Sequence, residues 1–136
     1  MKFFYFLGRV LFSLIFIIAA PRHFTREAVL HAAALGVPAS GVLVPISGVF
    51  AIVGALSVVT GYRARWGAWV LVGFLIPVTW WMHGYWRLSD PATIHIQQAM
   101  FAKNLSMLGA ALLISQFGAG PFSIDERQIK RLRARE

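Results

Sequence analysis

The sequence contains no cysteine. Without a thiol, the chain cannot form a disulfide bond, ligate a metal ion or an iron–sulfur cluster through thiolate, or use a thiolate as a nucleophile. Any redox chemistry would therefore need a bound cofactor or a partner protein.

Charged residues are also scarce. They make up 13% of the 136 residues, whereas hydrophobic residues make up 58%, and soluble domains usually carry about a quarter charged residues. The mean hydropathy of +0.67 argues against both a water-soluble enzyme and a disordered chain. The composition therefore predicts a membrane protein.

Four long apolar runs predict the topology. Because an α-helix rises about 1.5 Å per residue, roughly 17 to 25 apolar residues cross the hydrocarbon core of a bilayer. Runs of this length predict spans over residues 3–20, 42–60, 66–82 and 100–117, without the period-two alternation of a β-barrel strand. We expect an all-α transmembrane four-helix bundle over residues 1–120 and a basic cytoplasmic tail helix within residues 121–136.

Positive charge predicts the orientation of these spans. Outside them, the N-terminus, the second loop and the tail hold eight Lys and Arg residues, and the first and third loops hold three. Since positive loops stay in the cytoplasm, both termini are expected there. The tail cations are expected to contact the lipid bilayer rather than nucleic acid.

As an alternative, the first apolar run, residues 3–20, could be a cleaved secretory signal peptide, although Arg9 interrupts it and Pro21 would follow the cleavage site.

The first outer loop is long enough for a short helix. The candidate runs from Thr25 to Leu35, and Gly36 would end it with Pro38 beyond. Its apolar residues could face the membrane while Arg26 and His31 face water. We therefore expect an interfacial helix in this loop.

Small residues at four-residue spacing favour close contact between transmembrane helices, because lipid tails are as apolar as Leu and cannot drive helices together. The second and fourth spans each carry one such row: Ser47, Ala51 and Ala55, and Ala102, Ser106 and Ala110. Both rows are expected to face a neighbouring helix.

The acidic residues all lie outside the predicted spans. This argues against a proton relay or a cation path built on intramembrane carboxylates. Arg9 is the one charge well inside a span, and we expect it to anchor to headgroups or to backbone carbonyls. A functional role for Arg9 would need an anionic partner, and Asp125 in the tail is the candidate.

Polar and aromatic side chains gather at the predicted outer face. They could bind a quinone, since amide, amine and imidazole groups can donate to its carbonyls while aromatic rings stack on it. The candidate site residues are His23, His83, Trp86, Lys103 and Asn104. The alternative is an ordinary polar network at the membrane boundary. The histidines lack the i, i+3 or i, i+4 spacing of helical metal sites, so neither a metal nor a haem is expected.

Several short motifs follow one another in a recognisable order. They are Leu7-Gly8-Arg9, Leu35-Gly36-Val37-Pro38, Gly54, Gly61 with Arg63 and Arg65, His83-Gly84-Tyr85-Trp86, Phe101-Ala102-Lys103-Asn104-Leu105 with Leu108-Gly109, and Gly118-Ala119-Gly120-Pro121-Phe122-Ser123-Ile124-Asp125. Together they resemble the DoxX family over nearly the whole chain. The resemblance implies a small four-helix protein of the bacterial cytoplasmic (inner) membrane, although the Glu that members often carry in the second span is missing from residues 49–53.

The resemblance also implies a function. We expect an accessory or anchoring subunit of a membrane redox or respiratory complex, which packs against other membrane subunits and has no catalytic activity alone. Structural roles are assigned to Arg9, Gly54, Gly61 and Asp125. One alternative is a quinone-interacting oxidoreductase subunit that uses the outer-face site. Another is a protein that handles small solutes or lipids, which is less favoured because the spans lack polar residues to line a path.

Overall fold

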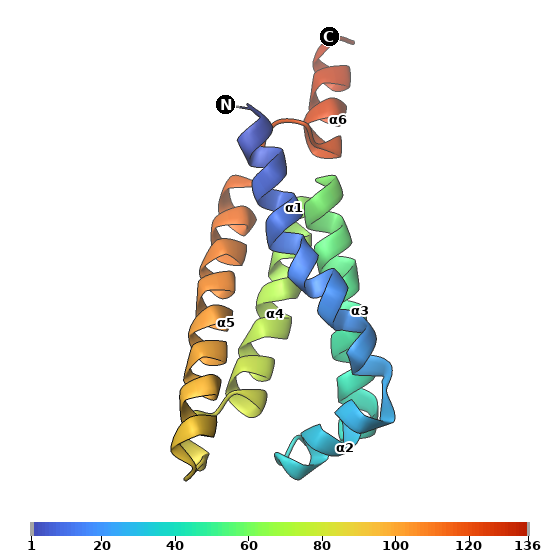
Figure 1. The fold of residues 1–136 in the computed structure, drawn as a ribbon. Helices are drawn as coiled ribbons and strands as arrows, with labels where there is room; N and C mark the ends of the chain where they lie inside the picture. The colour runs from blue at the N-terminus through green and yellow to red at the C-terminus, as the bar shows by residue number, and fades with distance from the viewer. Residues whose placement is uncertain (1, 136) are drawn as a thin grey trace.

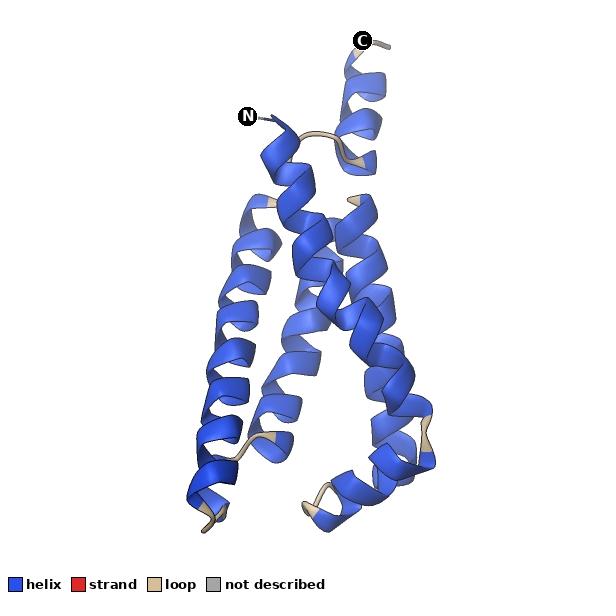
Figure 2. Ribbon diagram, in the orientation of Figure 1, coloured by secondary structure: helices blue, strands red, loops and turns tan. Residues whose placement is uncertain are grey.

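The computed structural model describes residues 2–135, which are helical apart from short connections (Figure 2). The elements are α1 (Lys2–Ala19), η1 (Ala20–Phe24), α2 (Arg26–Ala34), α3 (Ser40–Thr60), α4 (Ala64–Met82), η2 (Tyr85–Arg87), α5 (Pro91–Phe117) and α6 (Ile124–Arg133). Since this described part contains no strand, the predicted all-α class is confirmed.

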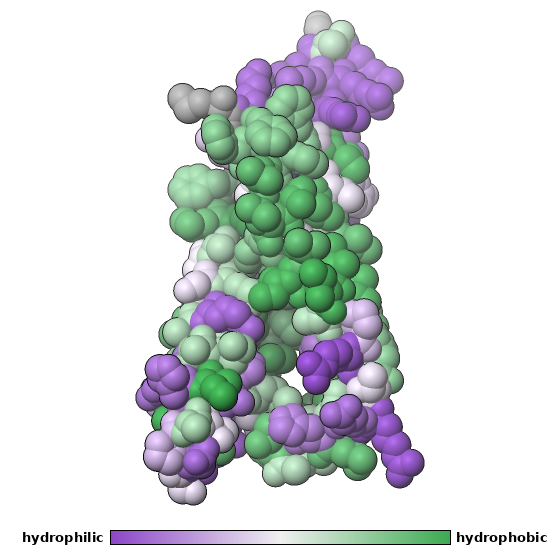
Figure 3. Space-filling model, viewed as in Figure 1, coloured by the Kyte–Doolittle hydropathy of each residue, from purple (hydrophilic) through white to green (hydrophobic). Residues whose placement is uncertain are grey.

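Four segments are long and apolar enough to cross a membrane. They are Lys2–Phe24, Ser40–Thr60, Ala64–Arg87 and Pro91–Phe117. Figure 3 shows hydrophobic residues over the middle of the visible face and hydrophilic residues at both ends. The chain is therefore a multi-pass membrane protein, as the four apolar runs predict.

Local sequence signals begin and end the predicted helix of the first loop. The Thr25 hydroxyl accepts a hydrogen bond from the backbone N–H of Ala28 at 3.2 Å, which caps α2. Past its other end, Gly36 adopts φ +82°, a conformation that residues with a Cβ rarely take. The short helix predicted from these residues is confirmed.

The fourth long helix begins earlier than predicted. The apolar run starts at residue 100, but α5 starts at Pro91. The Asp90 carboxylate accepts hydrogen bonds from Thr93 N at 2.9 Å and Thr93 Oγ1 at 2.6 Å, so it caps the helix. Pro91 fits the first helical position, where no backbone N–H is needed. Because the first turns of α5 carry polar residues, a search for apolar runs does not detect the part of the helix before residue 100.

The long helices pack in the order α1, α3, α4, α5, with α3 and α4 in the centre. The core is formed mainly by Leu71 and Leu75 of α4 against α1 and α3. Gly54 of α3 makes close packing possible, because a Cβ at this position would lie 2.7 Å from Leu71 Cγ and 2.9 Å from the carbonyl oxygen of Gly67. Its predicted structural role thus has a steric basis.

The two rows of small residues have different outcomes. In α3, Ala51 and Ala55 are buried in the core, as predicted. In α5, Ala102 and Ser106 are exposed, so the prediction that their row faces another helix of this chain is wrong. Asn104, Ala111 and Ser115 are the buried residues of α5. The reason is the helix order, since α5 packs chiefly against α4 and the exposed row lies away from that contact.

The bundle has two distinct ends (Figure 1). At one end, which we call the α6 end, lie the start of α1 and the whole of α6. At the other, the α2 end, lie α2 and the start of α5 with the preceding loop. Hydrophilic residues gather at these two ends (Figure 3), so most of the polar groups that could bind a ligand are found there.

Candidate functional site

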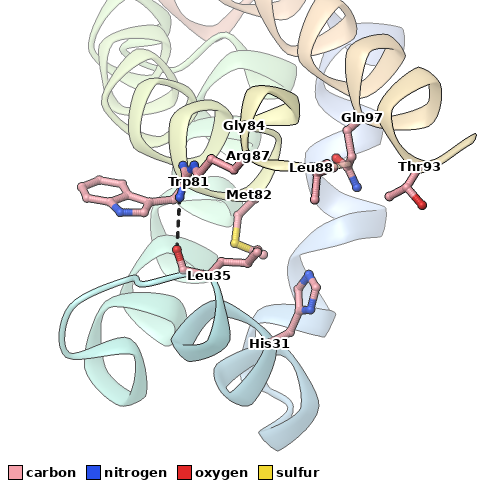
Figure 4. A pocket seen from close by; sticks show the side chains of 9 residues that line it. All are labelled: His31, Leu35, Trp81, Met82, Gly84, Arg87, Leu88, Thr93 and Gln97. Carbon is pink, nitrogen blue, oxygen red and sulfur yellow. Dashed lines mark hydrogen bonds between the residues drawn. The ribbon is translucent and has the colours of Figure 1, made fainter. Parts of the chain in front are cut away.

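A cavity of about 150 Å³ lies at the α2 end, between α2 and the corner formed by α4, η2 and α5. Most of its lining is apolar, and we call it the polar cavity because it also contains the polar side chains of both elements. Figure 4 shows side chains entering it from both sides, with His31 on α2 and Arg87, Thr93 and Gln97 across from it. None of the residues that line the polar cavity is acidic. Its surroundings therefore favour an anionic group.

Arg87 connects the two sides of the polar cavity. Its Nη1 donates to the carbonyl oxygen of Leu35 at 3.3 Å, drawn as a dashed line in Figure 4. Its Nη2 donates to the carbonyl oxygen of Trp80 at 2.7 Å. Because a guanidinium group has five N–H donors, an Arg87 fixed in this way still has donors for a ligand. Gly84 makes room for it, since a Cβ there would lie 2.8 Å from Arg87 Nη2.

An apolar groove of about 310 Å³ lies next to the polar cavity, between α4 and α5. Phe101, Leu105 and Leu108 of α5 form one wall, and Pro77 and Trp81 belong to the other. Trp81 also lines the polar cavity. The two hollows therefore adjoin at one side chain, with polar groups on one side of it and apolar groups on the other.

Two of the five predicted quinone-site residues lie beside these hollows. His83 Nδ1 is hydrogen-bonded to Gln97 Oε1 at 2.7 Å, and Gln97 lines the polar cavity. The Trp86 ring lies 5.7 Å from the ring of Phe101, which lines the apolar groove. Neither His83 nor Trp86 lines a hollow itself.

The other three predicted site residues line neither hollow. Lys103 is exposed, and its Nζ donates to the sulfur of Met100 at 3.4 Å. Asn104 is buried in the bundle. The His23 ring packs 5.6 Å from the ring of Phe74. Among residues 2–135, no hydrogen bond or aromatic contact joins His23 to the other four candidates.

Sequence reasoning missed Trp81 and Arg87 as site residues. The available signal was an aromatic residue and the single cation of a short loop, only a few residues apart. That signal does not reveal which element lies opposite the loop. Only the tertiary structure shows that the end of α2 supplies the facing wall and the carbonyl that holds Arg87.

A second polar network lies at the α6 end, and we call it the tail-docking network: Arg9, Gly61, Ser123 and Asp125. Arg9 is 4% exposed, and it donates from Nη1 to the carbonyl oxygen of Ala119 at 3.0 Å and from Nη2 to that of Phe122 at 2.8 Å. Arg9 therefore binds backbone carbonyls of the segment that leads to α6.

Asp125 completes the network from the other side. Its carboxylate accepts hydrogen bonds from Arg63 N at 2.8 Å and Ala64 N at 3.1 Å, and its own N–H donates to the carbonyl of Gly61 at 2.9 Å. A carboxylate at this position satisfies the free N–H groups at the start of α4. The network therefore holds the start of α6 against the turn between α3 and α4.

Among residues 2–135, no group of three or more His, Asp or Glu side chains could hold a metal ion.

A SURF4 family model matches residues 1–131, which cover the bundle, the tail-docking network and most of α6. The chain belongs to the SURF4 family. No curated protein and no solved structure matches it. As a SURF4 family protein, it is a member of a different family from DoxX, so the resemblance proposed from the short motifs is wrong.

The predicted function depended on that resemblance and is also wrong. The match to the SURF4 family overturns the role as a subunit of a redox or respiratory complex, whether accessory or quinone-linked. The structure gives a physical reason why the motifs misled. Gly61 and Gly118 end helices with positive φ, and Gly54 permits close packing. Such needs recur in small helical membrane proteins whatever their function.

Proposed function

We propose that this SURF4 family chain is a binding protein that holds an anionic amphiphile at its α2 end. The anionic head would occupy the polar cavity and the hydrocarbon tail the apolar groove. The observation that carries this proposal is that Trp81 lines both hollows, which places a site for the head and a site for the hydrocarbon tail on either side of one side chain.

Arg87 and His31 support an anionic head. A phosphate or carboxylate accepts charge-assisted hydrogen bonds from guanidinium, which are roughly twice as strong as neutral ones. Gln97 offers a further donor on the same lining through its amide nitrogen. No acidic side chain in that lining opposes the charge.

The apolar groove supports a hydrocarbon tail, but in a different way. Lipid tails are as apolar as the groove, so transfer from the bilayer gains little free energy. The groove therefore contributes through shape, with Phe101 and Leu105 against the tail. We expect the choice between ligands to be made by the head and the retention of the ligand to depend on both hollows.

We also propose that both termini face the cytoplasm, so that the α2 end opens to the opposite side. The support is the distribution of cations. Lys2, Arg63, Arg65 and the basic α6 lie at the α6 end, whereas Arg22, Arg26 and Arg87 lie at the α2 end. Loops with more Lys and Arg remain in the cytoplasm.

Native mass spectrometry of the full chain, released from nanodiscs of mixed phosphatidylglycerol and phosphatidylcholine, tests the site. Wild-type protein should retain phosphatidylglycerol preferentially. Arg87→Gln should lower this preference about tenfold or more, because hydrogen bonds to charged groups contribute about 1.5 to 3 kcal/mol. Leu105→Trp fills the groove and should reduce retention of both lipids.

Arg26→Gln is the matched control, because it removes a cation from α2 without touching either hollow. Thermal unfolding of each variant checks that the fold is kept. Equal retention of the two lipids by wild-type protein, or equal loss in Arg26→Gln and Arg87→Gln, would refute the proposed site.

A further inference from the structure

The tail-docking network brings cations from three separate segments to the α6 end. Asp125 ties the start of α6 to Arg63 and Ala64. Arg65 lies beside the end of α5, with its Nε 3.4 Å from the position of a Cβ on Gly118. Lys2 is near enough to Glu126 to act on its carboxylate. The start of α1, the α3–α4 turn and the start of α6 therefore adjoin (Figure 1).

Within residues 2–135, both acidic residues of this end are already engaged. Asp125 accepts from the backbone at the start of α4. Glu126 pairs with Lys130 at 2.8 Å and accepts from Phe122 N at 3.0 Å. Among residues 2–135, no ion pair involves the remaining basic residues of this end: Lys2, Arg63, Arg65, Arg127, Arg131, Arg133 and Arg135. The α6 end therefore carries a strong excess of positive charge.

Exposed aromatic residues place these cations at the membrane boundary. Tyr62, Trp66 and Phe122 are all exposed, and they flank Arg63 and Arg65 or precede α6. Phe3 and Phe4 are exposed next to Lys2. Tyr and Trp collect where hydrocarbon meets headgroups, because an apolar ring can be buried while its polar atom stays wet. The partner within reach of the cations is therefore the headgroup layer.

We propose that the α6 end is a defined binding site for anionic lipid headgroups, assembled by the tail-docking network from Lys2, Arg63, Arg65 and Arg127. The site lies at the opposite end from the amphiphile site proposed above and does not depend on it. Phosphate oxygens match these donors in charge and in hydrogen bonding. The docked tail is required, because Asp125 ties the start of α6 to the α3–α4 turn and Arg127 follows two residues after Asp125.

A single label on α6 measures binding at this end alone. The chain has no cysteine, so Gln128→Cys gives one attachment point for an environment-sensitive fluorophore on the exposed side of α6. The full chain in neutral detergent is titrated with dioctanoyl phosphatidylglycerol, with dioctanoyl phosphatidylcholine and with inorganic phosphate. We expect a saturable response to phosphatidylglycerol and a much weaker one to the other two. An equal response to inorganic phosphate or to phosphatidylcholine would overturn the lipid assignment.

Asp125→Asn separates an assembled site from simple charge attraction. The change makes the protein more positive, so attraction alone predicts tighter binding of phosphatidylglycerol. An assembled site predicts weaker binding, by about tenfold, because Asn offers one acceptor oxygen for the two N–H groups of Arg63 and Ala64 and so docks the tail less firmly. Asp90→Asn is the matched control, since it changes the charge equally at the α2 end and should leave the titration unchanged. Binding that tightens in Asp125→Asn would refute the proposal.

A second variant keeps the test valid if Asp125→Asn disturbs the fold. Among residues 2–135, no hydrogen bond or ion pair involves the side chain of Arg65 or Arg127. The double variant Arg65→Gln/Arg127→Gln should weaken phosphatidylglycerol binding about 25-fold, at roughly fivefold for each cation near an anionic surface. The double variant Arg22→Gln/Arg26→Gln at the α2 end should bind as wild type does. Equal weakening in both double variants would show attraction to net charge and overturn the proposal.

Discussion

At the scale of single residues, Arg9 shows how a cation is accommodated inside a transmembrane helix. The sequence leaves three possibilities open: an anchor to headgroups, an anchor to backbone carbonyls, or an acidic partner in the tail. The structure contains the second, with two charge-assisted hydrogen bonds to the carbonyls of Ala119 and Phe122. Asp125 approaches from the tail but bonds to backbone N–H groups of Arg63 and Ala64 instead. The free backbone N–H groups at the start of α4 therefore bind the Asp125 carboxylate in place of Arg9. The sequence pattern does not predict this choice.

Gly61 gives a residue-scale prediction. It has φ +68°, and a Cβ there would lie 2.5 Å from Arg9 Nη1 and collide with Ser123. We expect Gly61→Ala to lower the free energy of unfolding by about 2 kcal/mol, from backbone strain and displacement of Arg9. Gly109→Ala is the control, because Gly109 is helical with open space around it, and it should be neutral or slightly stabilising. Thermal unfolding followed by circular dichroism measures both, and equal melting temperatures would contradict the steric argument.

At the scale of elements, capping residues explain both a success and an error of prediction. Ser123 accepts from Glu126 N at 3.1 Å and begins α6, as the Ser and Glu spacing indicates. Asp90 followed by Pro91 is an equally good start signal, yet a search for apolar runs passes over it and begins the helix at residue 100. Hydropathy locates the part of a helix that lies in lipid, whereas caps locate the helix itself.

The pH dependence of α6 is an element-scale prediction. The hydrogen bond with Lys130 holds the pKa of the Glu126 carboxyl below its ordinary value of 4.5. Because the pKa is lowered in the folded state, ionised Glu126 stabilises α6 above that ordinary value, and this stabilisation is lost as the pH falls through the lowered pKa. We expect Cα chemical shifts of α6 to move toward coil values below about pH 4.5. Glu126→Gln should remove this dependence, and an unchanged transition in that variant would contradict the assignment to Glu126.

At the scale of the whole molecule, the order of helices decides where a ligand can bind. The polar cavity needs the end of α2 facing the α4–η2 corner, and the apolar groove needs α4 beside α5. Leu35 and Arg87 meet across that arrangement although they are far apart in sequence. The five residues of the predicted quinone site are expected at a similar depth in the bilayer, but the structure does not gather them in one hollow. Hydropathy predicts the depth of a residue in the bilayer, whereas helix packing determines the direction of its side chain.

The proposed orientation is tested at the same scale. The chain has no cysteine, so Ala134→Cys in the tail and Ser89→Cys before α5 each provide one thiol. In intact cells, an impermeant maleimide should label Ser89→Cys directly and Ala134→Cys only after permeabilisation. The reverse pattern would place the termini outside and contradict the proposal.

The amino-acid sequence by itself determined the membrane environment, the four spans, the helix of the first loop and the tail helix. These features depend on transfer free energies and local hydrogen bonds, which are properties of short segments. Tertiary structure alone decided the helix order, the carbonyls that bind Arg9, the N–H groups that bind Asp125 and the side chains that line the two hollows. Those contacts join distant segments, and in lipid they depend on close packing and on satisfying polar groups, because apolar patterning cannot distinguish one neighbour from another.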